Sequence, residues 1–144
     1  MANNVSSILN RKTKKIISTT PSTTVLEALK VMAENNIGSL IVMDGDNYMG
    51  IFSERDYSRK VILMGKHSHD TLVSEIMNTE NPIVTPQQSI DDCMELVSKL
   101  QARYLPVLEN GKVLGIISIL DLVEATSLMH KESAEQLRNY ISGS

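Results

Sequence analysis

Two short segments carry the same polar pair at the same spacing, Ser53-Glu-Arg-Asp56 and Ser118-Ile-Leu-Asp121. Each follows a glycine and two apolar residues, so a helix is expected to begin at the serine. In a capping box, the serine hydroxyl accepts the amide three residues on, and the acid bonds back to the serine amide. That role needs no ligand. A carboxylate and a helix start can also bind hydroxyl groups and phosphate oxygens, so both interpretations stay open.

Basic residues gather directly after the first of these segments. Arg55 and Arg59 share a helix face at positions i and i+4, and Lys60 follows them. The chain has a net charge of −3, so an anion would have to be bound by a local cluster such as this. The corresponding residues of the second segment are Leu120, Glu124 and Ala125. Packing of the helix therefore does not require the bases, and either a bound anion or a solvated helix face explains them.

The chain repeats itself at a spacing of 65 residues. The match runs without a gap from Thr20 over Thr85 to Asp56 over Asp121. The identical pairs are Thr20/Thr85, Pro21/Pro86, Leu40/Leu105, Val42/Val107, Gly50/Gly115, Ile51/Ile116, Ser53/Ser118 and Asp56/Asp121. A shorter echo precedes each copy, where 5–9 resembles 73–77. Two copies predict a pseudo-twofold pair, because a solenoid needs at least about three repeats.

Each copy predicts the same secondary structure. Apolar residues recur at helical spacing over 25–32 and 90–97, after capping-box patterns that begin at Thr24 and Ser89. Short apolar runs separated by turn residues predict two hairpins, with strands at 39–43, 48–52, 104–108 and 113–117. A second helix follows each Ser-x-x-Asp. The fold class is therefore α/β (α+β), with two β-α-β-β-α repeats packed as a pseudo-twofold pair.

The repeats divide the chain into four parts. We expect a first repeat at 5–64, a polar linker at 65–72, a second repeat at 73–126 and a helical tail at 127–144. In the tail, Ala134, Leu137 and Ile141 recur at helical spacing among charged residues. This narrow apolar face predicts a packing or dimer contact in preference to a membrane role, because the polar face is not strongly basic.

The duplicated Thr-Pro, the apolar strand pair and the Gly-apolar-apolar-Ser-x-x-Asp motif together resemble a tandem pair of cystathionine-β-synthase (CBS) repeats. The resemblance covers about residues 5–126. The run 52–60 is similar to a bacterial group of stand-alone two-repeat proteins, which are often described by analogy with the regulatory insert of inosine-monophosphate dehydrogenase. The resemblance implies a disc-like dimer and clefts between repeats that hold AMP, ATP, NAD or a related adenosine ligand.

The resemblance also implies which residues face the ligand. The Asp carboxylate would accept hydrogen bonds from the ribose hydroxyls, and each cleft would combine one repeat's Ser-x-x-Asp with the first strand of the other. One cleft would comprise Ser118, Asp121, Arg103, Lys14, Ile16, Ser18 and Ile37. The other would comprise Ser53, Arg55, Asp56, Arg59, Lys60, Ile83 and Ala102. Ile83 departs from the family, which often has Thr there, whereas the first copy has Ser18.

Several other functions find little support in the sequence. The net charge of −3 argues against nucleic acid as a partner, and no apolar run approaches the roughly 18 residues of a membrane span. With the polar first residues, this predicts a cytoplasmic protein. His67 and His69 lack the further ligands that a zinc site needs, so no metal is expected. Cys93, the single cysteine, fits a buried structural thiol.

The sequence shows no paired catalytic carboxylates, nucleophile elbow or phosphate-binding glycine loop, so we expect no enzyme activity. The leading hypothesis is a homodimeric regulatory module that binds an adenosine nucleotide (AMP, ATP or NAD) between its repeats and acts on an unknown partner protein in trans. The alternative is a structural dimerisation or interaction module without ligand sensing. Asp56 and Asp121 favour the first hypothesis, and Ile83 favours the second.

Overall fold

The computed structural model describes residues 3–12 and 15–142. The first repeat contains β1 (Ser18–Thr19), α2 (Val25–Asn35), β2 (Ser39–Asp44), β3 (Asn47–Ser53), α3 (Glu54–Tyr57) and a π-helical turn, η1 (Ser58–Ile62). The second repeat contains α5 (Ile90–Leu100), β4 (Tyr104–Glu109), β5 (Lys112–Ser118) and α6 (Ile119–Ser142). Two short helices, α1 (Val5–Arg11) and α4 (Val73–Ile76), precede the repeats. This mixed architecture confirms the predicted fold class.

The corresponding helices α2 and α5 begin as their sequences predict. The Thr24 side chain accepts a hydrogen bond from the Glu27 amide, and the Ser89 side chain accepts one from the Asp92 amide. Both helices end at a residue in the left-handed conformation, Asn36 (φ 53°) and Gln101 (φ 52°). The left-handed residue turns the chain sharply into the first strand of the hairpin. It therefore sets where β2 and β4 start.

The two hairpins share one register. Strands β2 and β3 are antiparallel, as are β4 and β5, and both pairs shift register at the equivalent step, after Val42 and after Val107. Strand β1 adds a parallel edge to β2. The expected first strand of the second repeat is reduced to one parallel bridge, between Val84 and Val107. The segment 82–86 begins and ends with proline, which lacks a backbone N–H, so it cannot extend the ladder.

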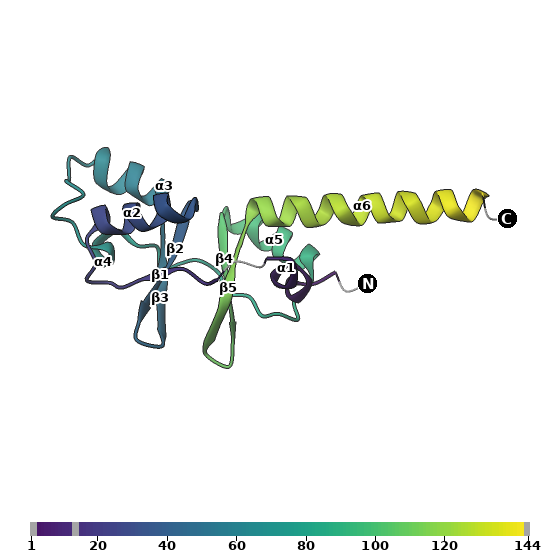
Figure 1. The fold of residues 1–144 in the computed structure, drawn as a ribbon, viewed down its shortest axis with the longest axis horizontal. Coiled ribbons are helices and arrows are strands. Elements are labelled where there is room, and N and C mark those ends of the chain that lie inside the picture. Colours follow the sequence, from purple (N-terminus) through teal and green to yellow (C-terminus); the bar gives the residue numbers. More distant parts are fainter. Residues whose placement is uncertain (1–2, 13–14, 143–144) are drawn as a thin grey trace.

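The short helices α1 and α4, which we call the leaders, are exchanged between the repeats. Val5 and Ile8 of α1 are buried in the core of the second repeat, whereas Val73 and Ile76 of α4 are buried in the core of the first. The Val5 amide donates to the Gln88 carbonyl at 2.9 Å. Figure 1 shows α1 beside α5 and α6, and α4 beside α2. The two repeats of the sequence are therefore not the two packing units of the fold.

The repeated glycines make room for these exchanged segments. A Cβ atom on Gly50 would lie 2.7 Å from the Asn78 carbonyl oxygen, and one on Gly115 would lie 2.9 Å from a methyl carbon of Leu9. The segment after α4 also pairs with β3, because the amides of Ile51 and Asn78 each donate to the other residue's carbonyl. The identical Gly50 and Gly115 thus follow from close packing against the leader.

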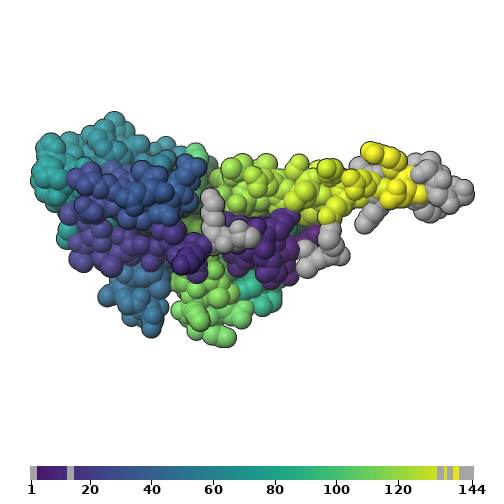
Figure 2. Space-filling view, viewed as in Figure 1, coloured from purple at the N-terminus to yellow at the C-terminus, as the bar shows by residue number. Residues whose placement is uncertain are grey.

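The last helix is longer than its counterpart in the first repeat. After Ser53 the helical path ends with η1 at Ile62, whereas after Ser118 the single helix α6 runs to Ser142. Figures 1 and 2 show α6 extending beyond the body that the two repeats form. The predicted apolar face of the tail at Ala134, Leu137 and Ile141 lies outside the side chains that the structure describes.

Candidate functional site between the repeats

Ser53 and Asp56 form a complete capping box at the start of α3. The Ser53 amide and hydroxyl both donate to Asp56 Oδ2, at 3.0 and 2.9 Å, and the Asp56 amide donates to Ser53 Oγ at 3.2 Å. Asp56 is only 8% exposed. The structural role considered from the sequence is therefore present, and it holds the carboxylate in one fixed orientation.

Lys60 neutralises the other oxygen of this carboxylate. Its Nζ lies 3.1 Å from Asp56 Oδ1 and donates to the Ile76 carbonyl at 3.1 Å. Because Ile76 belongs to the exchanged helix α4, Lys60 also ties α4 to the site. The Lys60 side chain is 45% exposed, so it can leave the carboxylate at a modest cost.

A cleft opens beside Asp56, with walls from both repeats. Two hollows, of about 260 and 210 Å³, share Arg55, Gln101, Ala102 and Arg103 as lining residues. The second hollow is also lined by Ile51, Ser53, Asp56, Arg59, Lys60, Asn78, Asn81 and Tyr104. The shared residues place the two hollows side by side, so together they offer more room than either alone.

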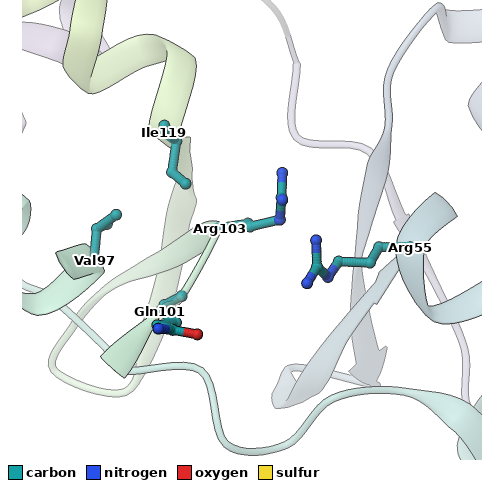
Figure 3. Close-up of a pocket in the computed structure, with 6 residues that line it drawn as sticks. Arg55, Val97, Gln101, Arg103 and Ile119 are labelled. Carbon is teal, nitrogen blue, oxygen red and sulfur yellow. The ribbon is translucent and has the colours of Figure 1, made fainter. Parts of the chain in front are cut away.

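Positive charges from both repeats converge on this cleft. Figure 3 shows the guanidinium groups of Arg55, from the first repeat, and Arg103, from the second, directed toward one another. The pKa of Arg55 is lowered from its ordinary value by partial loss of solvation and then by the charges of Arg103 and Arg59. With Lys60, four bases surround one buried carboxylate, an arrangement that favours a bound anion.

Tyr104 joins the two repeats at the edge of the cleft. A Cβ atom on Gly38 would lie 3.3 Å from the Tyr104 hydroxyl, so this glycine admits the tyrosine. Burial raises the pKa of Tyr104, and the charge of Glu54 raises it further. The phenol therefore stays neutral at physiological pH and acts as a hydrogen-bonding group.

The second motif has a different partner. The Ser118 amide donates to Asp121 Oδ2 at 2.9 Å, and the Asp121 amide donates to Ser118 Oγ at 3.1 Å. Lys12, from the segment after α1, places its Nζ 2.8 Å from the same Oδ2 and donates to the Ile116 carbonyl at 2.9 Å. Asp121 is thus held by a lysine that lies far away in the sequence.

Two residues lie elsewhere than the family resemblance implies. Arg103 lines the Asp56 cleft, which corrects its expected place with Asp121. Figure 3 shows its side chain directed from the second repeat toward Arg55 of the first. Ile83 is 52% exposed, and the wall of the cleft near it is formed by Asn78 and Asn81.

The remaining predicted residues belong to the connection into β1 and the end of α2. Ile16 is 48% exposed, Ser18 is exposed on β1, and Ile37 packs at the margin of the first core. Lys14 lies outside the described residues.

Five polar residues at the two sites were not predicted from the sequence: Lys12, Asn78, Asn81, Gln101 and Tyr104. Gln101 and Tyr104 flank the predicted Ala102 and Arg103, so proximity in sequence could have found them. Lys12 and the asparagines reach the sites only because the leader segments cross between the repeats.

Within residues 3–12 and 15–142, no group of three or more His, Cys, Asp or Glu side chains could hold a metal. Within the same ranges, no helix has both the length and the apolar character needed to cross a membrane.

Comparisons with known proteins place both repeats in one family. Residues 5–62 and 73–128 each match the family model of the CBS domain. The chain is 36% identical to the mitochondrial CBS domain-containing protein CBSX3 of Arabidopsis thaliana over 129 residues, which are 86% of this chain but only 63% of that protein. It is 30% identical to YhcV of Bacillus subtilis, a CBS domain-containing protein, over 96% of each chain.

A solved structure shares the fold at higher identity. A protein with CBS domains from Burkholderia ambifaria superposes with a TM-score of 0.81 at 45% identity, covering 85% of this chain and 93% of that one. With two family matches that together span most of the sequence, this chain belongs to the CBS domain family and carries two CBS domains in tandem.

Proposed function

We propose that this chain is a regulatory module that binds an adenosine nucleotide (AMP, ATP or NAD) in the Asp56 cleft and acts on another protein in trans. The observation that carries the proposal is the meeting of Arg55, Arg59, Lys60 and Arg103 around one buried carboxylate, with bases contributed by both repeats. CBS domains commonly bind adenosine ligands and regulate, so the family supports the same function. The resemblance to the regulatory insert of inosine-monophosphate dehydrogenase points the same way.

The proposed binding mode uses Asp56 for the ribose. Its Oδ2 is committed to Ser53, whereas Oδ1 faces the half-exposed Lys60. The ribose hydroxyls would share or replace the Lys60 contact, and Lys60 would keep its bond to the Ile76 carbonyl. Ala102, which is small and 8% exposed, leaves space for the base against the strand backbone.

The phosphates would be bound by the bases that remain. Guanidinium groups bind phosphate oxygens through paired, charge-assisted hydrogen bonds. Because Arg55 and Arg103 come from opposite repeats, an anion between them relieves their mutual repulsion and holds the repeats together. A ligand changes a protein's conformation only as far as it binds one state better. An anion held between Arg55 and Arg103 would bind the conformation in which the two repeats are close better than any other. A partner protein would respond to that conformation.

The two clefts differ in charge, and the placement of Arg103 increases the difference. All four bases belong to the Asp56 cleft, while Glu124 follows Asp121 by one helical turn. We therefore propose that the Asp56 cleft prefers ligands with more phosphate charge.

Homodimer formation is part of the proposal. The first half of α6 leaves Leu120, Val123 and Leu128 exposed by 64, 49 and 41%. A second copy would cover this face, as most soluble oligomers are symmetric assemblies of one chain. The cytoplasmic location expected from the sequence stays a prediction.

The alternative, a structural interaction module without ligand sensing, has one observation in its favour. Both Ser-x-x-Asp motifs form complete helix caps, and a lysine already neutralises each carboxylate. These contacts explain both aspartates without a ligand. They do not explain why Arg55 and Arg103 face one another.

Calorimetry separates the two functions. Protein that has been unfolded and refolded to remove copurified ligand is titrated with adenosine, AMP, ATP, NAD and S-adenosylmethionine. We expect saturable binding of at least one phosphate-bearing ligand, with adenosine weakest. Absence of heat and of any thermal shift with all five compounds would contradict nucleotide sensing and favour the structural module.

A further inference from the structure

The two hollows between the repeats differ in character. The hollow that Asp56 lines has mostly polar side chains around it. The other is lined by Val97 of α5 and by Ile119 at the start of α6, neither of which lines the first. Figure 3 shows Arg103 between these two side chains and Arg55. Val97 and Ile119 are half-buried, so they present an apolar wall that water still reaches.

This apolar wall belongs to the second repeat alone. At the repeat spacing of 65 residues, Ile119 corresponds to Glu54 and Val97 to Met32. Glu54 is exposed and charged, and Met32 is buried in the first core. The fold of a repeat therefore does not require an apolar side chain at the position of Ile119. The Ile119 amide donates to the Arg103 carbonyl at 3.0 Å, which keeps this wall beside the arginine.

The two arginines lie where the hollows meet. Arg55 and Arg103 line both hollows, as does Gln101. Two guanidinium groups match the two charges of a pyrophosphate, whose oxygens they bind through paired hydrogen bonds. Gln101 adds an amide that can both donate and accept. The cleft thus offers three regions in order: a carboxylate at Asp56, a pair of cations and an apolar wall.

We propose that the hollow lined by Val97 and Ile119 binds the second group of a dinucleotide. The adenosine of this ligand would lie at Asp56, and its pyrophosphate between Arg55 and Arg103. The inference rests on the proposed function and narrows its ligand to adenosine diphosphate joined to a second planar group.

The wall also sets the charge that this second group should carry. A mononucleotide leaves Val97 and Ile119 in contact with water, whereas a planar ring would cover them and gain the free energy of apolar burial. The Arg103 guanidinium beside the wall can stack on such a ring but repels a positive one. The uncharged ring of NADH, the reduced form of NAD, therefore fits better than the positive ring of NAD.

The test compares NADH with ADP-ribose, which lacks only the nicotinamide ring. In calorimetric titrations of the parent, we expect NADH to bind at least about tenfold more tightly than ADP-ribose. Its fluorescence should shift to shorter wavelength, because the ring leaves water. Val97→Ala and Ile119→Ala should each reduce this preference and leave the affinity for ADP-ribose unchanged. Leu114→Ala is the control, since it shortens a 36% exposed side chain of β5 that lines neither hollow.

The outcomes separate this inference from the function on which it rests. Equal affinities of the parent for NADH and ADP-ribose would overturn the second site and leave nucleotide binding intact. A preference that Leu114→Ala also loses, or that Ile119→Ala retains, would likewise overturn it. Because Val97 also packs against the second core, Ile119→Ala decides where the two variants disagree. A parent that binds neither ligand contradicts the proposed function, and the inference falls with it.

Discussion

At the scale of single residues, the capping role and the binding role of the Ser-x-x-Asp motif coexist. Asp56 uses one oxygen to start α3 and presents the other toward a cleft lined by bases. The same first role is present at Asp121, where Lys12 contacts the capping oxygen, Oδ2. Equal motifs therefore differ in their surroundings because of residues that the motif does not contain.

The basic cluster is tested by reversing one charge. Arg59 lines the Asp56 cleft and adds to the positive field at Arg55. We predict that Arg59→Glu lowers the affinity for ATP by at least about tenfold while adenosine binding changes less. The salt dependence of ATP binding should also become flatter, because fewer charges are screened.

Glu124→Gln serves as the comparison, since it alters one charge at the corresponding position of the second repeat. An Arg59→Glu protein that discriminates between adenosine and ATP as the parent does would show that the cluster is only a solvated helix face.

At the scale of elements, the exchange of α1 and α4 is the feature that builds the sites. The exchanged segments bring Lys12 to Asp121, and Asn78 and Asn81 to the Asp56 cleft. They also fill the cores, since Val5 and Val73 are completely buried. Any change that loosens the leaders should therefore affect stability and the clefts together.

Gly50 and Gly115 lie where the leaders and the segments after them pack against the hairpins. A Cβ atom at Gly50 meets a backbone oxygen, whereas one at Gly115 meets the end of a leucine side chain, which can turn away. We predict that Gly50→Ala lowers the free energy of unfolding by about 1–3 kcal/mol and Gly115→Ala by clearly less. Urea unfolding followed by circular dichroism measures both. Equal losses, or a larger loss at Gly115, would contradict the packing described for Asn78.

Local patterns predicted most of the elements, and tertiary contacts decided the rest. The caps at Thr24 and Ser89 and both hairpins depend on neighbours in sequence, so their patterns were sufficient. The exchange of the leaders was not predictable, because the segments that begin at Val5 and Val73 have the same apolar pattern. Arg103 was placed in the wrong cleft for a related reason: its position precedes β4, but a long side chain can reach either side.

At the scale of the whole molecule, the exposed apolar residues of α6 call for a partner. Leu120 and Val123 lie one turn apart on a helix that extends beyond the body. Covering such a face by a second copy is the simplest way to remove it from water.

We predict a dimeric mass in light scattering at micromolar concentrations, with and without nucleotide. Leu120→Glu combined with Val123→Glu should shift the mass toward the monomer without changing the circular dichroism spectrum, because both side chains are exposed within one chain. A monomeric mass for the parent would contradict the dimer.

The central claim is that the nucleotide binds between the repeats at Asp56. Replacing each aspartate by asparagine, one at a time, tests it most directly. Asp56→Asn retains an oxygen for the Ser53 amide but removes the charge that faces the cleft, and Asp121→Asn makes the identical change in the second repeat. In calorimetric titrations with ATP, we predict at least a tenfold loss of affinity for Asp56→Asn and parental affinity for Asp121→Asn. Parental affinity for Asp56→Asn, with binding lost in Asp121→Asn, would contradict the account.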